Sequence, residues 1–238
     1  MSTITHAPLG DRRLARLALL VAGLCVVGLA LTWILAELVP ITHVKDAVAL
    51  YDLTRLDRPL VEAPANALLD LLYPPFYAAW GLILVAIALH RRLPWVAVAV
   101  AILLPLAPWT AELLKPLLAH QHDQIGTKYI ANASWPSGHA TAAATLVWCA
   151  LLVAPPSERR LVAIVGALFA LAVGAALLVL AWHMPSDVVG GYLLATFWAA
   201  LAFAALRVGG KDGDAISAAS ARLGGGRRAP GAVRAWSP

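Results

Sequence analysis

Six long stretches of this chain carry no charged side chain, and this pattern constrains its fold more than any other feature. The hydrocarbon core of a membrane is about 30 Å thick, and a helix needs about 20 residues to cross it. The six charge-free stretches, each about that long or longer, are residues 17–36, 71–90, 93–111, 129–157, 161–186 and 188–206. The first part of the fourth stretch is polar and contains Pro136, so only its later part is expected to span. We therefore predict an all-α polytopic membrane protein with six transmembrane helices in a bundle.

The overall composition excludes a soluble protein. Hydrophobic residues make up 61% of the 238 residues and charged residues 13%, against roughly a quarter charged in an ordinary soluble domain. So few polar side chains cannot cover the outside of a soluble core of this size. Membrane lipids rather than nucleic acid are therefore the expected partners of this chain, despite its net charge of +5. Oligomeric state is not encoded in any pattern.

The basic residues gather in alternate connections. Thirteen of the 18 Lys and Arg residues precede the first span, join the second to the third or the fourth to the fifth, or follow the sixth. The positive-inside rule predicts that both termini are cytoplasmic and that loops 38–69, 119–139 and 182–187 face outward across the cell (plasma or inner) membrane. Residues 1–206 form the predicted membrane domain. Residues 207–238, rich in Gly, Arg, Ala and Ser, are expected to be a disordered basic cytoplasmic tail.

Several polar and aromatic residues near the predicted span ends invite structural interpretations. Residues 45–62 alternate apolar and charged side chains, which predicts a short helix at the interface. Glu37 is expected at the interface and His43 in solvent. Trp135 and Trp182 fit an aromatic belt, although both adjoin polar segments and could touch a lipid head group.

The sequence Pro136, Ser137, Gly138, His139 comes directly before the apolar run that starts at Ala140. A proline followed by small residues favours a helix N-terminus, whose backbone N–H groups and dipole bind an anion such as phosphate. Gly138 lets the backbone approach that anion closely. His139 is placed to donate a proton to a leaving oxygen, because histidine titrates near neutral pH. The alternative is a histidine that only caps the helix.

Two further elements carry candidate chemistry. Asp187 follows His183 by four residues, in the first turn of the helix expected to begin at Pro185, so its carboxylate can reach the imidazole. Such a contact fixes the tautomer and makes the other ring nitrogen a candidate nucleophile towards phosphorus. Lys115 lies near the outer end of the third span, where burying a charge is costly, and Glu112 is its expected partner.

These three elements, in this order, resemble the type 2 phosphatidic acid phosphatase superfamily of integral membrane lipid phosphatases, which also includes soluble vanadium haloperoxidases and acid phosphatases. The family pattern is KxxxxxxRP, then PSGH, then SRxxxxxHxxxD. Lys115 matches the first lysine, residues 136–139 complete the second motif, and His183 and Asp187 complete the end of the third. The resemblance covers about residues 110–200.

The resemblance implies a mechanism and a substrate class. His183 would attack phosphorus to form a phosphohistidine, Asp187 would orient it, and His139 would protonate the leaving group. No metal or cofactor would be required. The expected substrate is a lipid phosphate or diphosphate, such as phosphatidate, phosphatidylglycerol phosphate or polyprenyl diphosphate, hydrolysed at the extracytoplasmic face. The residues implied to bind its phosphate are Lys115, Ser137 and Gly138.

The sequence departs from the family pattern at both arginines. The first-motif arginine position is His122, or His120 in the spacing of some members, and Asp123 replaces the proline. The Ser and Arg of the third motif correspond to Ala176 and Leu177. Arginine offers phosphate a permanent charge and a bidentate fork, whereas histidine with a pKa of ~6.5 is mostly neutral at pH 7. Losing one preorganised donor typically slows catalysis by about 10²- to 10³-fold.

Three interpretations follow. In the first, the chain is a phosphatase whose missing charge is supplied by protonated His120 and His122 and by Lys128. In the second, it is a catalytically impaired pseudo-phosphatase that binds a phospholipid or a partner protein. In the third, nitrogen and oxygen ligands form a metal site suited to zinc. The ligands of that third interpretation would be His120, His122, Asp123, His139, His183 and Asp187.

Overall fold

The computed structural model describes residues 9–119 and 130–209, and all regular secondary structure within them is helical. The predicted tail therefore lies almost entirely outside the described residues. The candidate residues His120, His122, Asp123 and Lys128, in the second loop predicted to face outward, also lie outside the described residues.

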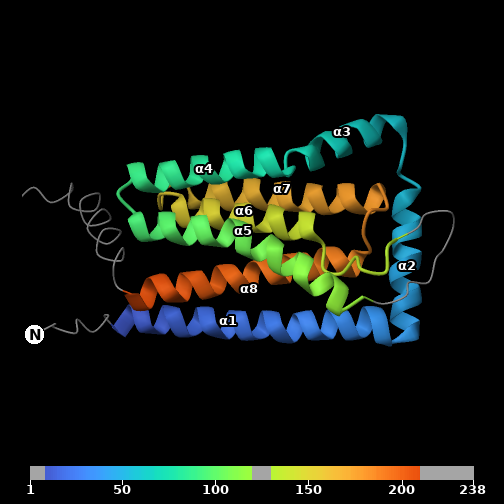
Figure 1. Ribbon diagram of the computed structural model, residues 1–238, viewed down its shortest axis with the longest axis horizontal. Coiled ribbons are helices and arrows are strands. Elements are labelled where there is room, and N and C mark those ends of the chain that lie inside the picture. Colours follow the sequence, from blue (N-terminus) through green and yellow to red (C-terminus); the bar gives the residue numbers. More distant parts are fainter. Residues whose placement is uncertain (1–8, 120–129, 210–238) are drawn as a thin grey trace, which may run out of the picture.

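Each charge-free stretch overlaps most of one helix, and these six helices run side by side along the long axis of the molecule (Figure 1). They are α1 (Leu9–Trp33), α4 (Pro74–His90), α5 (Pro94–Leu117), α6 (Gly138–Val153), α7 (Arg159–Val179) and α8 (Pro185–Gly209). Among the described residues, four helices are long and apolar enough to cross a membrane, and α3 (Pro59–Asp70) with α4 forms a fifth candidate bent by 55°. The 16-residue α6 is apolar but shorter. The all-α membrane fold is thus confirmed.

The basic connections lie together at one end of the bundle, which is the end where α1 begins and α8 stops (Figure 1). Arg91, in the turn between α4 and α5, donates a hydrogen bond to the carbonyl of Val153 at the end of α6. Arg159, at the start of α7, donates through Nε to the carbonyl of Ala154 at 3.3 Å. The opposite end holds the start of α6 and the turn from α7 into α8 (Figure 1).

The first loop predicted to face outward differs from the single short helix predicted over 45–62. After a short π-helical turn at Ile34–Leu38, α2 (Pro40–Thr54) lies across the end of the bundle, and α3 follows it (Figure 1). Pro59 occupies the first turn of α3, where its missing N–H is not needed, and Arg58 before it is extended, with φ −138° and ψ 154°. The break between two helices therefore comes from proline chemistry that the apolar pattern does not show.

The crossing of α6 and α8 depends on a glycine. A Cβ atom added at Gly191 would lie 2.7 Å from the carbonyl oxygen of Ser137 and 3.0 Å from the amide nitrogen of Thr141. Neither backbone atom can move without shifting α6. Only glycine therefore lets α8 lie directly against the first turn of α6, and this contact brings two of the sequence motifs to the same place.

Candidate active site

A histidine in the turn just before α8 contacts a carboxylate in the first turn of that helix. Asp187 is completely buried, and its Oδ2 accepts a hydrogen bond from the amide N–H of Met184 at 3.0 Å. The same oxygen lies 3.1 Å from Nδ1 of His183. The expected contact between carboxylate and imidazole is confirmed. Because Nδ1 faces the carboxylate, Nε2 is the ring nitrogen left on the other side, available to act on a substrate.

The first turn of α6 adjoins that pair. Ser137 is the N-cap of α6, fully buried, and its Oγ accepts a hydrogen bond from the amide of Ala140 at 3.3 Å. Its own backbone N–H donates to the carbonyl of Asp187 at 3.0 Å, which joins the two helix starts directly. A hydroxyl that accepts one bond can still donate its proton to an anion. Ser137 is therefore the cap of α6, and because it is fully buried and does not line the cavity described below, contact of its hydroxyl with a phosphate stays a prediction.

A carboxylate lies against the N-terminus of α6. Lys115 Nζ is 2.6 Å from Glu112 Oε1, so the predicted ion pair is confirmed. A Cβ atom at Gly138 would lie 2.6 Å from the same Glu112 oxygen and 3.8 Å from Lys115 Nζ. This oxygen therefore lies beside both the helix start and the lysine, where an anionic ligand is electrostatically favoured. Its position against α6 could not be anticipated, because spacing within α5 does not show what that helix faces.

A cavity of about 1000 Å³ connects these side chains. His139 is half-buried, and its ring meets that of Trp182 edge to face, with centroids 5.6 Å apart and an interplanar angle of 70°. Lys115, Gly138, His139 and His183 all line the cavity, while Asp187 is buried beneath the histidine. From this polar end the cavity continues between α4 and α5, where its walls are apolar. The lining of that part includes Tyr77, Ala78, Gly81, Leu82, Val85, Ala101 and Leu104.

Comparison with known proteins identifies the family. The family model for the PAP2 superfamily matches residues 83–209, more than half of the chain. The chain belongs to the PAP2 superfamily. The resemblance drawn from its three motifs is thereby confirmed, and the protein is a multi-pass membrane protein of this superfamily.

A solved structure supports the same fold. The crystal structure of the first transmembrane PAP2 type phosphatidylglycerolphosphate phosphatase from Bacillus subtilis matches with a TM-score of 0.63 and 17% sequence identity. The match covers 79% of this PAP2 chain and 94% of the other. At that identity, the likeness establishes a shared fold. A comparison with curated protein sequences gave no match.

One polar contact of this PAP2 site was not foreseen from the sequence. Asp46 of α2 accepts two hydrogen bonds from Ser186 in the first turn of α8, from the amide at 3.2 Å and from Oγ at 2.6 Å. Burial raises the pKa of the Asp46 carboxyl, although the hydrogen bonds from Ser186 oppose that shift, and the nearby charge of Asp187 adds to it. Asp46 thus caps α8 from another helix, and no local pattern links residues 140 positions apart.

Two further polar residues near α2 are buried, contrary to expectation. Glu37 is 5% exposed rather than interfacial, and His43 is 7% exposed rather than solvated. Nδ1 of His43 lies 2.6 Å from the carbonyl oxygen of Ala36. Because α2 lies across the end of the bundle, it covers residues that a hydropathy pattern places at the membrane surface.

The two residues that differ from the third motif of the family lie in the apolar core of this PAP2 domain. Leu177, at the arginine position, is completely buried and belongs to the same hydrophobic cluster as Ala140, Val173 and Val188. Ala176, at the serine position, is 6% exposed in that cluster. The structure therefore places packing side chains where the family pattern has polar ones. The first-motif positions, His120 and His122, lie outside the described residues.

Trp135 is not part of an aromatic belt. It is 4% exposed and packs on α8, where a Cβ atom at Gly190 would lie 2.7 Å from its Nε1. Gly190 leaves the space that the indole ring occupies. Trp182, in contrast, is 48% exposed and lines the cavity beside His139.

The described part of the chain contains no group of three His, Cys, Asp or Glu side chains placed to hold a metal ion. Three of the ligands considered for the metal interpretation, His120, His122 and Asp123, lie outside that part.

Proposed function

We propose that this PAP2 protein is a membrane phosphatase that hydrolyses a lipid phosphate or diphosphate through a phosphohistidine. The observation that carries the proposal is the His183 ring held at Nδ1 by the buried Asp187 and lining a cavity shared with Lys115 and His139. A buried carboxylate on one nitrogen fixes the tautomer and makes the other nitrogen more basic.

Each of these side chains has a role in the proposed reaction. Nε2 of His183 attacks phosphorus, the bond from phosphorus to the lipid oxygen breaks, and His139 donates a proton to that oxygen. Water then gives a proton to His139 and attacks the phosphohistidine, so that the bond from phosphorus to Nε2 breaks, phosphate leaves and both histidines are restored. Lys115, Ser137 and the backbone at Gly138 hold the phosphoryl oxygens during both steps.

The apolar half of the cavity supports a lipid as substrate. The polar side chains are confined to one end, and the remaining walls, between α4 and α5, offer hydrocarbon contacts over residues such as Leu82, Val85 and Leu104. A soluble phosphate ester would leave these walls without a partner. An acyl or prenyl chain fills them, while its phosphate reaches His183.

The proposed orientation in the cell membrane follows the distribution of charge. All six long helices span, residues 1–206 form the membrane domain, and both termini are cytoplasmic, with 207–238 as a disordered basic tail. This is supported by the basic turns at the end of the bundle opposite the site (Figure 1). The 16 residues of α6 measure about 24 Å, less than the ~30 Å core, so the site is recessed below the outer interface.

Other side chains are proposed to supply the positive charge that the two missing arginines would bring to the site. Protonated His120 and His122, with Lys128, supply part of the positive charge that two arginines provide in the family pattern. The activity should then rise as the pH falls towards 6, because histidine gains its charge near its ordinary pKa of ~6.5.

A second function is a pseudo-phosphatase that binds phospholipid without turnover. The specific observation in its favour is Leu177, which fills the arginine position with a completely buried apolar side chain. Such a protein would keep the anion site at Lys115 and Gly138 and lose only the stabilisation of the transition state.

One set of assays separates the candidates. Purified protein is given phosphatidate, phosphatidylglycerol phosphate or polyprenyl diphosphate, with and without chelator, beside a His183→Ala variant. Phosphate release that disappears in the variant and resists chelator supports the phosphatase. Release that is equal in the variant refutes it, and binding of the lipids without any release supports the pseudo-phosphatase.

A further inference from the structure

One face of α2 packs on the turn that carries His183. The contact is a buried apolar cluster made of Ile130, of Ala47 and Leu50 from α2, and of Ala181 and Met184 from the turn. Asp46 lies on the same side of α2 and accepts two hydrogen bonds from Ser186, which directly precedes Asp187. The turn that positions the proposed nucleophile is therefore supported from outside by α2.

A second face of the same helix is apolar but exposed. Its side chains, between 42% and 65% exposed, are Ile41, Val44, Val48 and Tyr51. A helix turns about 100° per residue, which places these side chains about 80–160° around α2 from His43, in the middle of the buried face. Lys45 and Asp52 lie farther round, at about 180–200°. The exposed apolar face therefore lies beside the buried one, and two charged side chains lie opposite the bundle.

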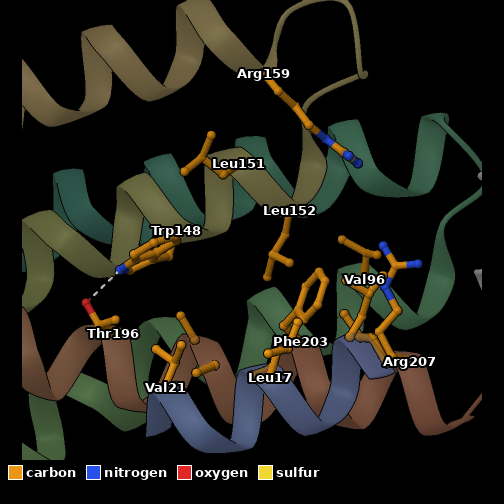
Figure 2. A pocket seen from close by; sticks show the side chains of 15 residues that line it. Leu17, Val21, Val96, Trp148, Leu151, Leu152, Arg159, Thr196, Phe203 and Arg207 are labelled. Atoms are coloured by element: carbon orange, nitrogen blue, oxygen red, sulfur yellow. Dashed lines mark hydrogen bonds between the residues drawn. The ribbon is translucent and has the colours of Figure 1, made fainter. Parts of the chain in front are cut away.

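The chain enters α2 directly from a membrane span. The candidate span Arg12–Leu38 ends just before α2 begins at Pro40. Within it, Leu17 and Val21 line an apolar space shared with α6 and α8 (Figure 2). A neighbouring row of exposed side chains runs to the end of the span and consists of Leu20, Leu24, Val27, Leu31, Leu35 and Leu38. The exposed apolar face of α2 therefore continues the lipid-facing surface of α1, at the level where the span ends.

The composition and depth of this face favour a lipid surface as its occupant. An amphipathic helix that begins where a span ends holds its apolar side chains at the boundary between head groups and acyl chains. Tyr51 carries the amphipathic ring that is enriched at this boundary. Lys45 and Arg55 are exposed beside the apolar face, where long basic side chains reach the phosphates of lipids.

We propose that the exposed apolar face of α2 rests on the lipid surface at the active-site end of the bundle, and that this contact holds the turn at residues 181–187 in place. Lipid on one side of α2 and the turn on the other form one continuous support. When the lipid contact is lost, α2 loosens, and the turn loses its contacts with Leu50 and Asp46. As an activation of catalysis by the lipid surface, the inference rests on the proposed function. The order of the turn, in contrast, can be measured without turnover.

Spin labels on α2 test the lipid contact in the full chain, reconstituted in nanodiscs of phosphatidylglycerol and phosphatidylcholine. Val48→Cys places a label on the exposed apolar face, and Lys45→Cys places one opposite the bundle. Cys25 and Cys149 are buried, so the parent protein supplies the background signal. The label at position 48 should be more accessible to oxygen, which concentrates in lipid, than to a water-soluble nickel chelate, and the label at position 45 should show the reverse. Greater access of the chelate at position 48 would place this face in water, and dipolar broadening between labels would place a second copy there; either result overturns the proposal.

Hydrogen exchange of the peptide that covers residues 181–188 tests the coupling in the same nanodiscs. The Val44→Gln, Val48→Gln double variant removes the lipid contact without weakening the helix, because Gln forms helices at least as well as Val. Amide exchange at Met184 and Ser186 should become about fivefold faster, and kcat should fall by a similar factor. Ala49→Gln is the matched control, because Ala49 is exposed on another side of α2 and its replacement should change neither quantity.

The outcomes of the exchange experiment separate the coupling from the proposed function. Exchange at the turn that is equal in the double variant and the parent, or equally faster in Ala49→Gln, would overturn the coupling. Faster exchange at the turn together with unchanged exchange in α6 supports it and excludes general unfolding. A parent protein that releases no phosphate contradicts the proposed function, while the exchange rates still decide whether lipid contact orders the turn.

Discussion

Neutralising Glu112 should strengthen the binding of phosphate to this protein. Its Oε1 lies 2.6 Å from Lys115 Nζ and would lie 2.6 Å from a Cβ on Gly138, so the carboxylate is next to the proposed phosphate position. A phosphate that enters must displace this side chain or bind beside a like charge. Glu112→Gln removes the charge and keeps the shape of the side chain.

The size of the effect follows from distance and exposure. Two unit charges 4 Å apart near a protein surface interact with about 4 kcal/mol. The Glu112 side chain is 55% exposed, so solvent screening reduces the net effect to about 1 kcal/mol or less. The KM for a lipid phosphate, and the Ki of inorganic phosphate, should therefore fall by up to about fivefold. The change should shrink as salt is added, because exposed charges are screened.

Steady-state kinetics in detergent micelles at low and high salt measure this prediction. Glu158→Gln is the control, because Glu158 is an exposed glutamate immediately before α7, at the other end of the bundle. Unchanged or increased KM and Ki in Glu112→Gln would refute the reasoning, since the carboxylate would then not compete with the anion.

Three further variants test how the site is held. Gly191→Ala should destabilise the fold by about 1–3 kcal/mol and lower the melting temperature, because its Cβ would meet the backbone of α6, whereas Gly23→Ala, with nothing within 4 Å, should not. Asp46→Ala removes the cap on α8, which should lower the free energy of unfolding by about 1 kcal/mol. This variant should lower kcat more than it changes KM. Asp46→Asn keeps one hydrogen-bond acceptor and should therefore recover part of the lost kcat. Equal kcat values for the Ala and Asn variants would argue against capping. Ala181→Gly should raise the melting temperature, because Ala181 has a φ of 56° and the strain of about 1 kcal/mol is relieved; a lower melting temperature would contradict this.

The predictable parts of the fold are those that depend on neighbours in sequence. Lipid requires an uninterrupted apolar surface, so the charge-free stretches locate the long helices without any knowledge of packing. The same holds for Lys115 and Glu112, which are three residues apart on one face of α5. It also holds for His183, which lies two residues before α8 and within reach of Asp187 in the first turn of that helix. Local spacing alone was therefore enough to predict these two contacts.

The remaining features depend on contacts between distant segments. Asp46 meets Ser186 only because α2 folds across the bundle end, and the burial of His43 has the same cause. The backbone bond from Ser137 to Asp187 requires the close crossing that Gly191 permits. Nothing in the periodicity of any one segment encodes these contacts.

The central claim is that His183 forms a covalent bond to phosphorus. Rapid acid-free quenching during turnover, followed by proteolysis and mass spectrometry, would detect one phosphoryl group on the peptide that contains His183. The proposed function predicts this adduct in the parent protein, and its absence in His183→Ala. Turnover in the parent protein with no adduct on His183, or an adduct on another residue that persists in His183→Ala, would contradict it.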